Sequence, residues 1–169
     1  YIEPMAMKWA KDNGLRCLDL GGRIASGVGY ETVDLRDADV IANLNERWPF
    51  EDGSVGVIRA MDVFEHLKDS IHTMKELYRV LAPGGYAFIQ VPSTDGRGAF
   101  QDPTHVSFWN ENSFMYYTSR DFNKYIDCPV RFQAIRMYTT EKNQMQVCWV
   151  VAHLVKPSDE VLMPGPMSI

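Results

Sequence analysis

Acidic and glycine residues that could bind a ligand follow two short apolar runs near the start of the chain. The first run ends in Asp19-Leu20-Gly21-Gly22 and the second in Val33-Asp34-Leu35. Such runs predict neighbouring parallel strands, whose carboxyl ends meet at the crevice where open α/β sheets bind ligands. Glycine lets a ligand approach the backbone closely, and a carboxylate at the second strand's tip can accept hydrogen bonds from a ribose diol. The residues expected to bind this ligand are Asp19, Leu20, Gly21, Gly22, Asp34 and Leu35.

Two histidines follow later predicted strands and are the candidates for proton transfer. His66 lies four residues after Asp62, and on a short helix Asp62, Glu65 and His66 could face the crevice together. His105 lies in a long predicted loop, where Asp102 could fix its tautomer. Because imidazole has a pKa of about 6.5, either ring can act as a base at neutral pH. The alternatives stay open: a helix-cap or positioning contact for His66, and a hydrogen bond that holds the loop for His105.

The elements that must position these residues alternate between strand and helix. Apolar runs predict strands at 16–20, up to 34, 39–44, 55–59, 86–91, 131–138 and 144–155, and helical spacing predicts helices at 4–13, 70–81 and within 111–126. This order predicts an α/β, Rossmann-like fold: a mostly parallel seven-stranded sheet flanked by helices, with a C-terminal antiparallel hairpin. Residues 21–30 hold four glycines in ten positions. A parallel connection normally needs a dozen or more residues, so we expect the first crossover helix to be short or missing.

The length and composition bound the classes of protein that fit. The chain of 169 residues predicts one domain over 1–156 and an extended tail over 157–169, which carries three prolines. A net charge of -5 disfavours nucleic acid as a partner. The three cysteines lie far apart with no Cys-x-x-Cys, which predicts reduced thiols in a cytoplasmic protein and indicates neither a zinc knot nor a disulfide framework. The longest apolar run, 147–155, is too short to cross a bilayer, so no membrane association is expected; the oligomeric state stays unknown.

Several landmarks stand in the order and spacing of a known family. They are Leu18-Asp19-Leu20-Gly21-Gly22, Gly29-Tyr30-Glu31-Thr32-Val33-Asp34-Leu35, Trp48-Pro49-Phe50-Glu51-Asp52-Gly53-Ser54, Asp62-Val63-Phe64-Glu65-His66-Leu67 and Arg79-Val80-Leu81-Ala82-Pro83-Gly84-Gly85. Over roughly 15–91, the chain resembles the class I S-adenosylmethionine-dependent methyltransferases, and within them the type 11-like subgroup. The resemblance implies that Asn43 and Leu44 contact adenine, with Asn43 capping a turn as the alternative. It also implies that Ala60, Met61 and Asp62 hold the methionine part. Some quinone O-methyltransferases with a similar Glu-x-x-Glu-His segment use a metal, but here Asp62 stands at the first position, so we expect no metal site.

The function implied by this resemblance is in-line transfer of a methyl group from S-adenosyl-L-methionine to a small-molecule or glycan-like acceptor. We expect the loop 92–110 to cover the methyl group, with His105 and His66 facing the acceptor. We expect Gly21→Val to block the ligand sterically and to leave the fold mostly intact. The alternative is a degenerate domain that binds the donor or a partner without catalysis. A nicotinamide oxidoreductase is disfavoured because Gly27-Val28-Gly29 lacks the third glycine of the dinucleotide motif and precedes a strand.

Overall fold

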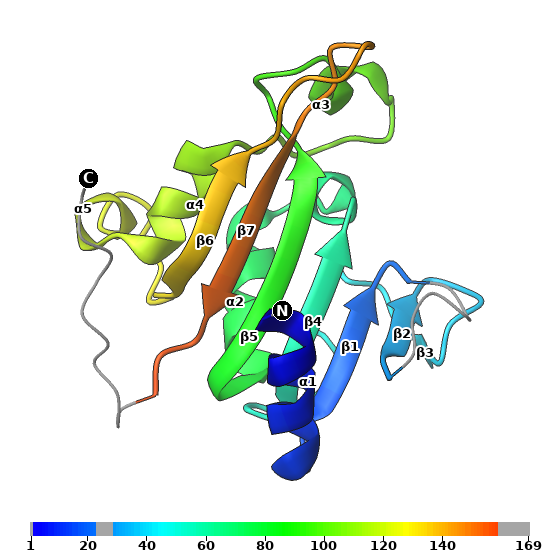
Figure 1. The fold of residues 1–169 in the computed structure, drawn as a ribbon, viewed down its shortest axis with the longest axis vertical. Helices are drawn as coiled ribbons and strands as arrows, with labels where there is room; N and C mark the ends of the chain where they lie inside the picture. Colours follow the sequence, from blue (N-terminus) through cyan, green and yellow to red (C-terminus); the bar gives the residue numbers. More distant parts are fainter. Residues whose placement is uncertain (1, 23–28, 159–169) are drawn as a thin grey trace.

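A twisted sheet of seven strands lies at the centre of the computed structural model, which describes residues 2–22 and 29–158 (Figure 1). The strands are β1 (Arg16–Leu20), β2 (Glu31–Asp34), β3 (Val40–Ile41), β4 (Val55–Met61), β5 (Leu81–Pro92), β6 (Gln133–Thr139) and β7 (Trp149–Val155). Their order is β3-β2-β1-β4-β5-β7-β6. The first five strands pair in parallel, whereas β7 is antiparallel to both β5 and β6. The prediction of a mostly parallel sheet with an antiparallel C-terminal hairpin is therefore confirmed.

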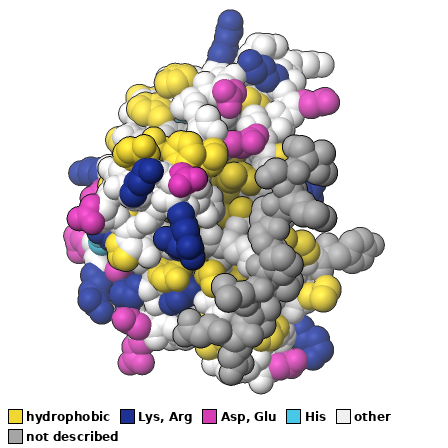
Figure 2. Space-filling model, turned by 90° about the vertical axis from the view of Figure 1, so that its left-hand side faces the viewer, with side chains coloured by type: hydrophobic (Ala, Val, Ile, Leu, Met, Phe, Trp, Pro, Cys, Tyr) yellow, Lys and Arg dark blue, Asp and Glu magenta, His cyan; other side chains and the backbone are white. Residues whose placement is uncertain are grey.

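Helices cover both faces of this sheet. They are α1 (Ile2–Asp12), the short 3-10 helix η1 (Phe64–His66), α2 (Ser70–Val80), α3 (Gly98–Gln101), α4 (Glu111–Thr118) and α5 (Arg120–Asn123). Helix α1 lies on one face, and α2 lies on the opposite face, behind β4 and β5 in the view of Figure 1. Among the described residues, no helix is long and apolar enough to span a membrane. Figure 2 shows the side bearing α4, α5 and β6, where acidic and basic side chains are interspersed among hydrophobic ones.

Strand β4 shows how the sheet separates two hydrophobic cores. After a register shift between Val55 and Val57, its successive side chains point to opposite faces. Val57 packs with Ala6 and Ala10 of α1, whereas Ile58 joins the larger core beneath α2 and α4. A Cβ on Gly56 would stand only 2.4 Å from the Cβ of Ala10, so α1 packs directly against the backbone of β4. Burial on both faces explains why β4 reads as an almost continuous apolar run.

Several element boundaries differ from the predicted ones, most of them by one or two residues, but the last strand begins at Trp149 and not at residue 144. Three further differences have local reasons. The third strand is short because Asp39, instead of extending it, accepts hydrogen bonds from the backbone and side chain of Thr32 and so closes the preceding turn. Strand β5 begins early because Leu81 already pairs with Val55, across a register shift. The predicted helical region 111–126 divides into α4 and α5 because the backbone of Ser119 is extended.

The connection between β1 and β2 is only partly described. Gly21, Gly22, Gly29 and Tyr30 are not helical. Residues 23–28, which include Gly27 and Val28, lie outside the described residues, as do residues 159–169 of the predicted tail. The ten positions from 21 to 30 must therefore carry the whole connection between these two parallel strands.

Candidate functional site

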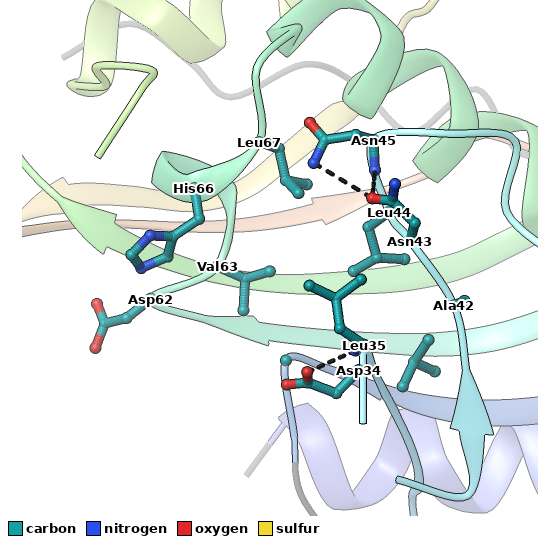
Figure 3. Close-up of a pocket in the computed structure, with 12 residues that line it drawn as sticks. Asp34, Leu35, Ala42, Asn43, Leu44, Asn45, Asp62, Val63, His66 and Leu67 are labelled. Atoms are coloured by element: carbon teal, nitrogen blue, oxygen red, sulfur yellow. Dashed lines mark hydrogen bonds between the residues drawn. The ribbon is translucent and has the colours of Figure 1, made fainter. Parts of the chain in front are cut away.

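A cavity of about 370 Å³ lies at the carboxyl ends of the parallel strands (Figure 3). This volume is within the range of about 300–1,000 Å³ that is usual for small-molecule sites. Its lining comes from the segments that follow β1, β2, β3 and β4: Gly21, Val33, Asp34, Leu35, Ala42, Asn43, Leu44, Asn45, Asp62, Val63, His66 and Leu67. The strands converge at this edge because they run in parallel, and so four distant parts of the chain share one cavity.

A second cavity of about 480 Å³ shares Gly21 with the first. Its lining residues are Glu3, Asp19, Leu20, Gly21, Gly22, Arg59 and Met61. The residues that the sequence marked for ligand binding are thus divided between the two cavities. Ala60 is the exception, because its side chain is buried in the core and lines neither of them.

Asp34 offers a carboxylate to the first cavity from the end of β2. Its Oδ1 accepts a hydrogen bond of 2.6 Å from the backbone N–H of Leu35, which orients the side chain. Within the described part of the chain, its Oδ2 accepts no hydrogen bond. This oxygen is therefore available to a hydroxyl group of a ligand.

Gly21 adopts a backbone conformation that glycine alone adopts readily. Its φ is +70°, and its N–H donates to the carbonyl oxygen of Val33 at 2.7 Å. A Cβ at this position would stand 2.4 Å from Cγ2 of Val63. The expectation that Gly21→Val leaves the fold mostly intact is therefore wrong, because the new side chain would collide with Val63 before it met a ligand.

The second cavity has a charged wall formed by Asp19 and Arg59. The guanidinium of Arg59 donates to both carboxylate oxygens of Asp19, at 3.0 Å from Nε and 2.7 Å from Nη2. It also stacks over the ring of Tyr30 at 4.4 Å and lies 3.9 Å from Glu3. The hydrogen bond to Asp19 is the main reason that the pKa of Arg59 is raised. Sequence reasoning missed Arg59 because nothing marks a charge in the middle of a buried strand as part of a site.

The side chain of Asn43 is largely committed to its own turn. Its Oδ1 accepts a hydrogen bond of 3.1 Å from the backbone N–H of Asn45, and its Nδ2 donates to Glu46 at 3.1 Å. These contacts are the ones expected from the alternative interpretation, in which Asn43 caps a turn. Nδ2 of Asn45 donates to the same Oδ1 at 3.4 Å, so Asn43 lines the first cavity with a side chain that the turn already holds.

Asp62 lines the first cavity and also contacts the start of β7, the strand that follows β5 in the sheet order. It holds a left-handed backbone, with φ of 55°, directly after β4. Its Oδ1 accepts a hydrogen bond of 3.0 Å from the indole N–H of Trp149, at the start of β7. Burial raises the pKa of Asp62, although its hydrogen bonds with the side chains of Trp149 and Gln90 oppose the shift. Non-glycine residues in this conformation are uncommon and concentrate at functional sites.

The two candidate histidines lie side by side, with their rings edge to face at 5.0 Å. His66 has 40% of its side chain exposed and lines the first cavity, whereas His105 has 7% exposed and lines neither cavity. Nδ1 of His66 lies 3.2 Å from the carbonyl oxygen of Thr104, and Nδ1 of His105 lies 3.1 Å from that of Ala99. The expectation that Asp102 fixes the tautomer of His105 is corrected here, because the carbonyl of Ala99 does so.

Glu65, which we expected to face the crevice with Asp62 and His66, is instead buried beside both histidines and does not line the first cavity. Its side chain is 3% exposed, and neither carboxylate oxygen has a hydrogen-bond partner among the described residues. Burial raises the pKa of Glu65 to about 7, and the charges of Asp62 and Asp102 add to the shift. Its backbone carbonyl accepts hydrogen bonds from Val106 and Ser107, which fasten the loop 92–110 onto η1.

Comparison with known proteins places this arrangement among methyltransferases. A family described as a methyltransferase domain matches residues 7–127. A protein of Mycolicibacterium smegmatis, described as a probable S-adenosylmethionine-dependent methyltransferase, is 36% identical over 81 residues. That match covers 46% of this chain and 30% of the relative, so the chain corresponds to only part of that protein.

Solved structures show the same fold. Phosphoethanolamine N-methyltransferase 2 of Haemonchus contortus, in complex with S-adenosyl-L-methionine, is 18% identical with a TM-score of 0.59, and the match covers 86% of this chain and 49% of that one. A SAM-dependent methyltransferase from Aquifex aeolicus is 16% identical with a TM-score of 0.54, and the match covers 89% of each chain. At these identities, the likeness concerns the fold alone.

Proposed function

Because this chain belongs to the S-adenosylmethionine-dependent methyltransferase domain family, we propose that it transfers a methyl group from S-adenosyl-L-methionine to a small-molecule acceptor. The observation that carries this proposal is the pair of cavities that meet at Gly21. One of them presents the carboxylate of Asp34, and the other presents the Asp19–Arg59 pair. A donor with a nucleoside at one end and an amino acid at the other needs two adjoining subsites of this kind.

The residues of the two cavities fit the two ends of the donor. The Oδ2 of Asp34 would accept hydrogen bonds from the ribose hydroxyls, while Leu35, Asn43 and Leu44 would contact adenine. Around the methionine end, the contacts would come from Asp19, Leu20, Gly21, Gly22, Met61 and Asp62, with Ala60 supporting them from the core. Arg59 and Asp19 carry charges opposite to those of the methionine carboxylate and ammonium. The sulfonium supplies an already activated methyl group, so the protein needs mainly to align the acceptor.

The acceptor would enter beside η1, where the loop 92–110, which lines neither cavity, would form the outer wall. His66 supports this placement because it lines the first cavity and is partly exposed. Its Nδ1 donates to the carbonyl of Thr104, so its Nε2 carries the lone pair that can take a proton from the acceptor. A general base of this kind typically contributes about 100- to 10,000-fold to the rate. His105 is buried and would support the loop and the ring of His66.

Calorimetric titration of the chain with S-adenosylhomocysteine tests this proposal. We expect one molecule to bind per chain, because the two cavities together form one donor site. A parallel fluorescence titration with NADH serves as the control ligand, and we expect no change in it. If S-adenosylhomocysteine does not bind, the proposal fails and the degenerate domain becomes the better interpretation.

A further inference from the structure

Three potential metal ligands converge beside the proposed methyl-transfer site. Glu65, His66 and His105 each offer one ligand atom, and these atoms lie within 4.8 Å of one another. The Nε2 atoms of both histidines lie 3.9 Å from the same oxygen, Oε1 of Glu65. We infer that these three residues bind a divalent cation of the zinc class, contrary to the expectation from the sequence. The role of this cation in the reaction rests on the proposed function, but its binding does not.

The hydrogen bonds of the two histidines involve Nδ1 and leave Nε2, the nitrogen nearer Glu65, free to bind a metal. In each ring, Nδ1 faces a backbone carbonyl oxygen, that of Thr104 for His66 and that of Ala99 for His105. A carbonyl only accepts hydrogen bonds, and the hydroxyl of Thr104, also 3.2 Å from Nδ1 of His66, already donates to Asp102. In the neutral rings, Nδ1 therefore carries the proton and Nε2 carries the lone pair. Histidines that bind metals in proteins are held in the same way, with the other ring nitrogen donating to a carbonyl or carboxylate.

The buried carboxyl group of Glu65 has no partner that would stabilise its charge, so either a proton or a cation must neutralise it. Both of its oxygens are buried and have no hydrogen-bond partner among the described residues. A buried charge without a partner is strongly unfavourable, and such groups in proteins are paired or bind metals. The groups that face Glu65 from the two histidines are lone pairs, not N–H groups. A cation between the three residues would satisfy all of these acceptors together.

The charges around the cluster also favour a cation. The carboxylate of Asp102 lies 3.9 Å from Nε2 of His105, on the loop that packs over η1. Asp62 stands at the other side, held by the indole N–H of Trp149. Both carboxylates act electrostatically on Glu65. The cation would therefore lie in a pocket of negative potential without needing either residue as a direct ligand.

The ligand set selects the kind of metal. Imidazole nitrogen suits zinc and neighbouring transition metals, whereas magnesium prefers oxygen ligands. In tetrahedral coordination at about 2.1 Å, ligand atoms stand about 3.4 Å apart. The observed 3.9 Å is close to this spacing, so small side-chain movements would complete the site. Because His66 is 40% exposed and lines the first cavity, a fourth position would remain open on that side.

The open position gives the acceptor a chemical class. A small molecule with a hydroxyl group could bind there through its oxygen, since a metal of this class lowers the pKa of a bound hydroxyl. With the cation bound, Nε2 of His66 is a ligand and no longer the base of the proposed function. The hydroxyl would therefore release its proton to solvent, and its oxygen would form the new O–C bond. The C–S bond of the donor would break with its electron pair staying on sulfur. The product would be a methyl ether.

Calorimetric titration of the EDTA-treated chain with zinc chloride at neutral pH tests the site. We expect one zinc ion to bind per chain, and magnesium chloride to give no binding. Glu65→Gln and His105→Ala should each weaken zinc binding by more than about 100-fold, the upper end of what loss of a supporting group costs. His72→Ala is the matched control, because this histidine lies on α2 outside the cluster, and its zinc affinity should equal that of the unaltered chain.

Two results would overturn the inference. One is the absence of stoichiometric zinc binding to the unaltered chain. The other is zinc binding that survives in both cluster variants, which would assign it to the thiols of Cys17, Cys128 or Cys148. If a variant does not fold, crystals of the unaltered chain soaked in zinc decide, because the anomalous peak must lie between Glu65, His66 and His105. A parallel titration with S-adenosylhomocysteine separates the two proposals, since donor binding without zinc binding would remove this inference alone.

Discussion

Backbone conformation at the strand ends shapes the proposed donor site more than any single reactive group. Gly21 after β1 and Asp62 after β4 both have left-handed φ values, of 70° and 55°. Each turns the chain sharply at the edge of the sheet, and Gly21 leaves room for Val63, which lies between the two cavities and η1. The glycine was visible in the sequence as a position that needs this freedom. The conformation of Asp62 was not, because aspartate adopts it only where the surrounding structure imposes it.

The contact between Gly21 and Val63 predicts a coupling that can be measured. Gly21→Ala should lower the free energy of unfolding by about 1–3 kcal/mol, because the new Cβ overlaps Cγ2 of Val63 and the φ is unfavourable. Val63→Ala removes the overlapping methyl group. It should therefore destabilise the Gly21→Ala chain less than it destabilises the unaltered chain, as measured by urea denaturation of all four forms. Strictly additive effects would show that the two residues do not interact.

At the scale of elements, helix α2 is tied to the loop that precedes β4. Arg79 donates to both oxygens of Glu76, at 2.8 and 2.7 Å, and to Asp52 at 2.7 Å. Glu76 in turn accepts from the backbone N–H of Trp48 at 2.7 Å. The ring of Trp48 is buried in the core, as is that of Phe50. This loop therefore contributes to packing, and its aromatic rings do not line the first cavity.

The Glu76–Arg79 pair predicts a pH-dependent contribution to stability. Burial opposes ionisation of Glu76, but its bonds to Arg79 and Trp48 outweigh burial and lower its pKa below the ordinary 4.5. The folded state therefore favours the ionised form, so this stability is present above pH 4.5 and is lost as the pH falls through the folded pKa. Glu76→Gln should lower the free energy of unfolding by about 1.5–3 kcal/mol at pH 7, and by less as the pH falls below 4.

Denaturation with urea across this pH range measures the effect. Glu141→Gln provides the control, because Glu141 is exposed and does not contact Glu76 or Arg79. Its stability should follow that of the unaltered chain at every pH. A deficit in Glu76→Gln that stays constant from pH 7 to pH 3 would mean that the ionised carboxylate contributes nothing beyond what the amide provides.

At the scale of the whole molecule, the sequence predicted what depends on local pattern and missed what depends on tertiary contact. Apolar runs predicted β1 and β4 well because these strands are buried on both faces. Because these strands were predicted, their carboxyl ends were predicted too, and so was the place of Asp19, Gly21 and Asp34 at the cavities. The loss of hydrogen-bond partners at Glu65 could not be predicted, because it arises only when a distant loop closes over η1. Arg59 was missed for the same reason, since its partner lies on another strand.

The central claim, that the donor lies across the two cavities with its ribose on Asp34, is tested most directly by one calorimetric comparison. S-adenosylhomocysteine is titrated into the unaltered chain, into Asp34→Ala, and into Asp121→Ala, whose exposed carboxylate lies on α5 away from both cavities. A hydrogen bond to a charged group contributes about 1.5–3 kcal/mol, so Asp34→Ala should weaken binding by about ten- to a hundredfold. Asp121→Ala should bind as tightly as the unaltered chain. Equal affinity in all three, with Asp34→Ala folded, would contradict the account and place the donor elsewhere.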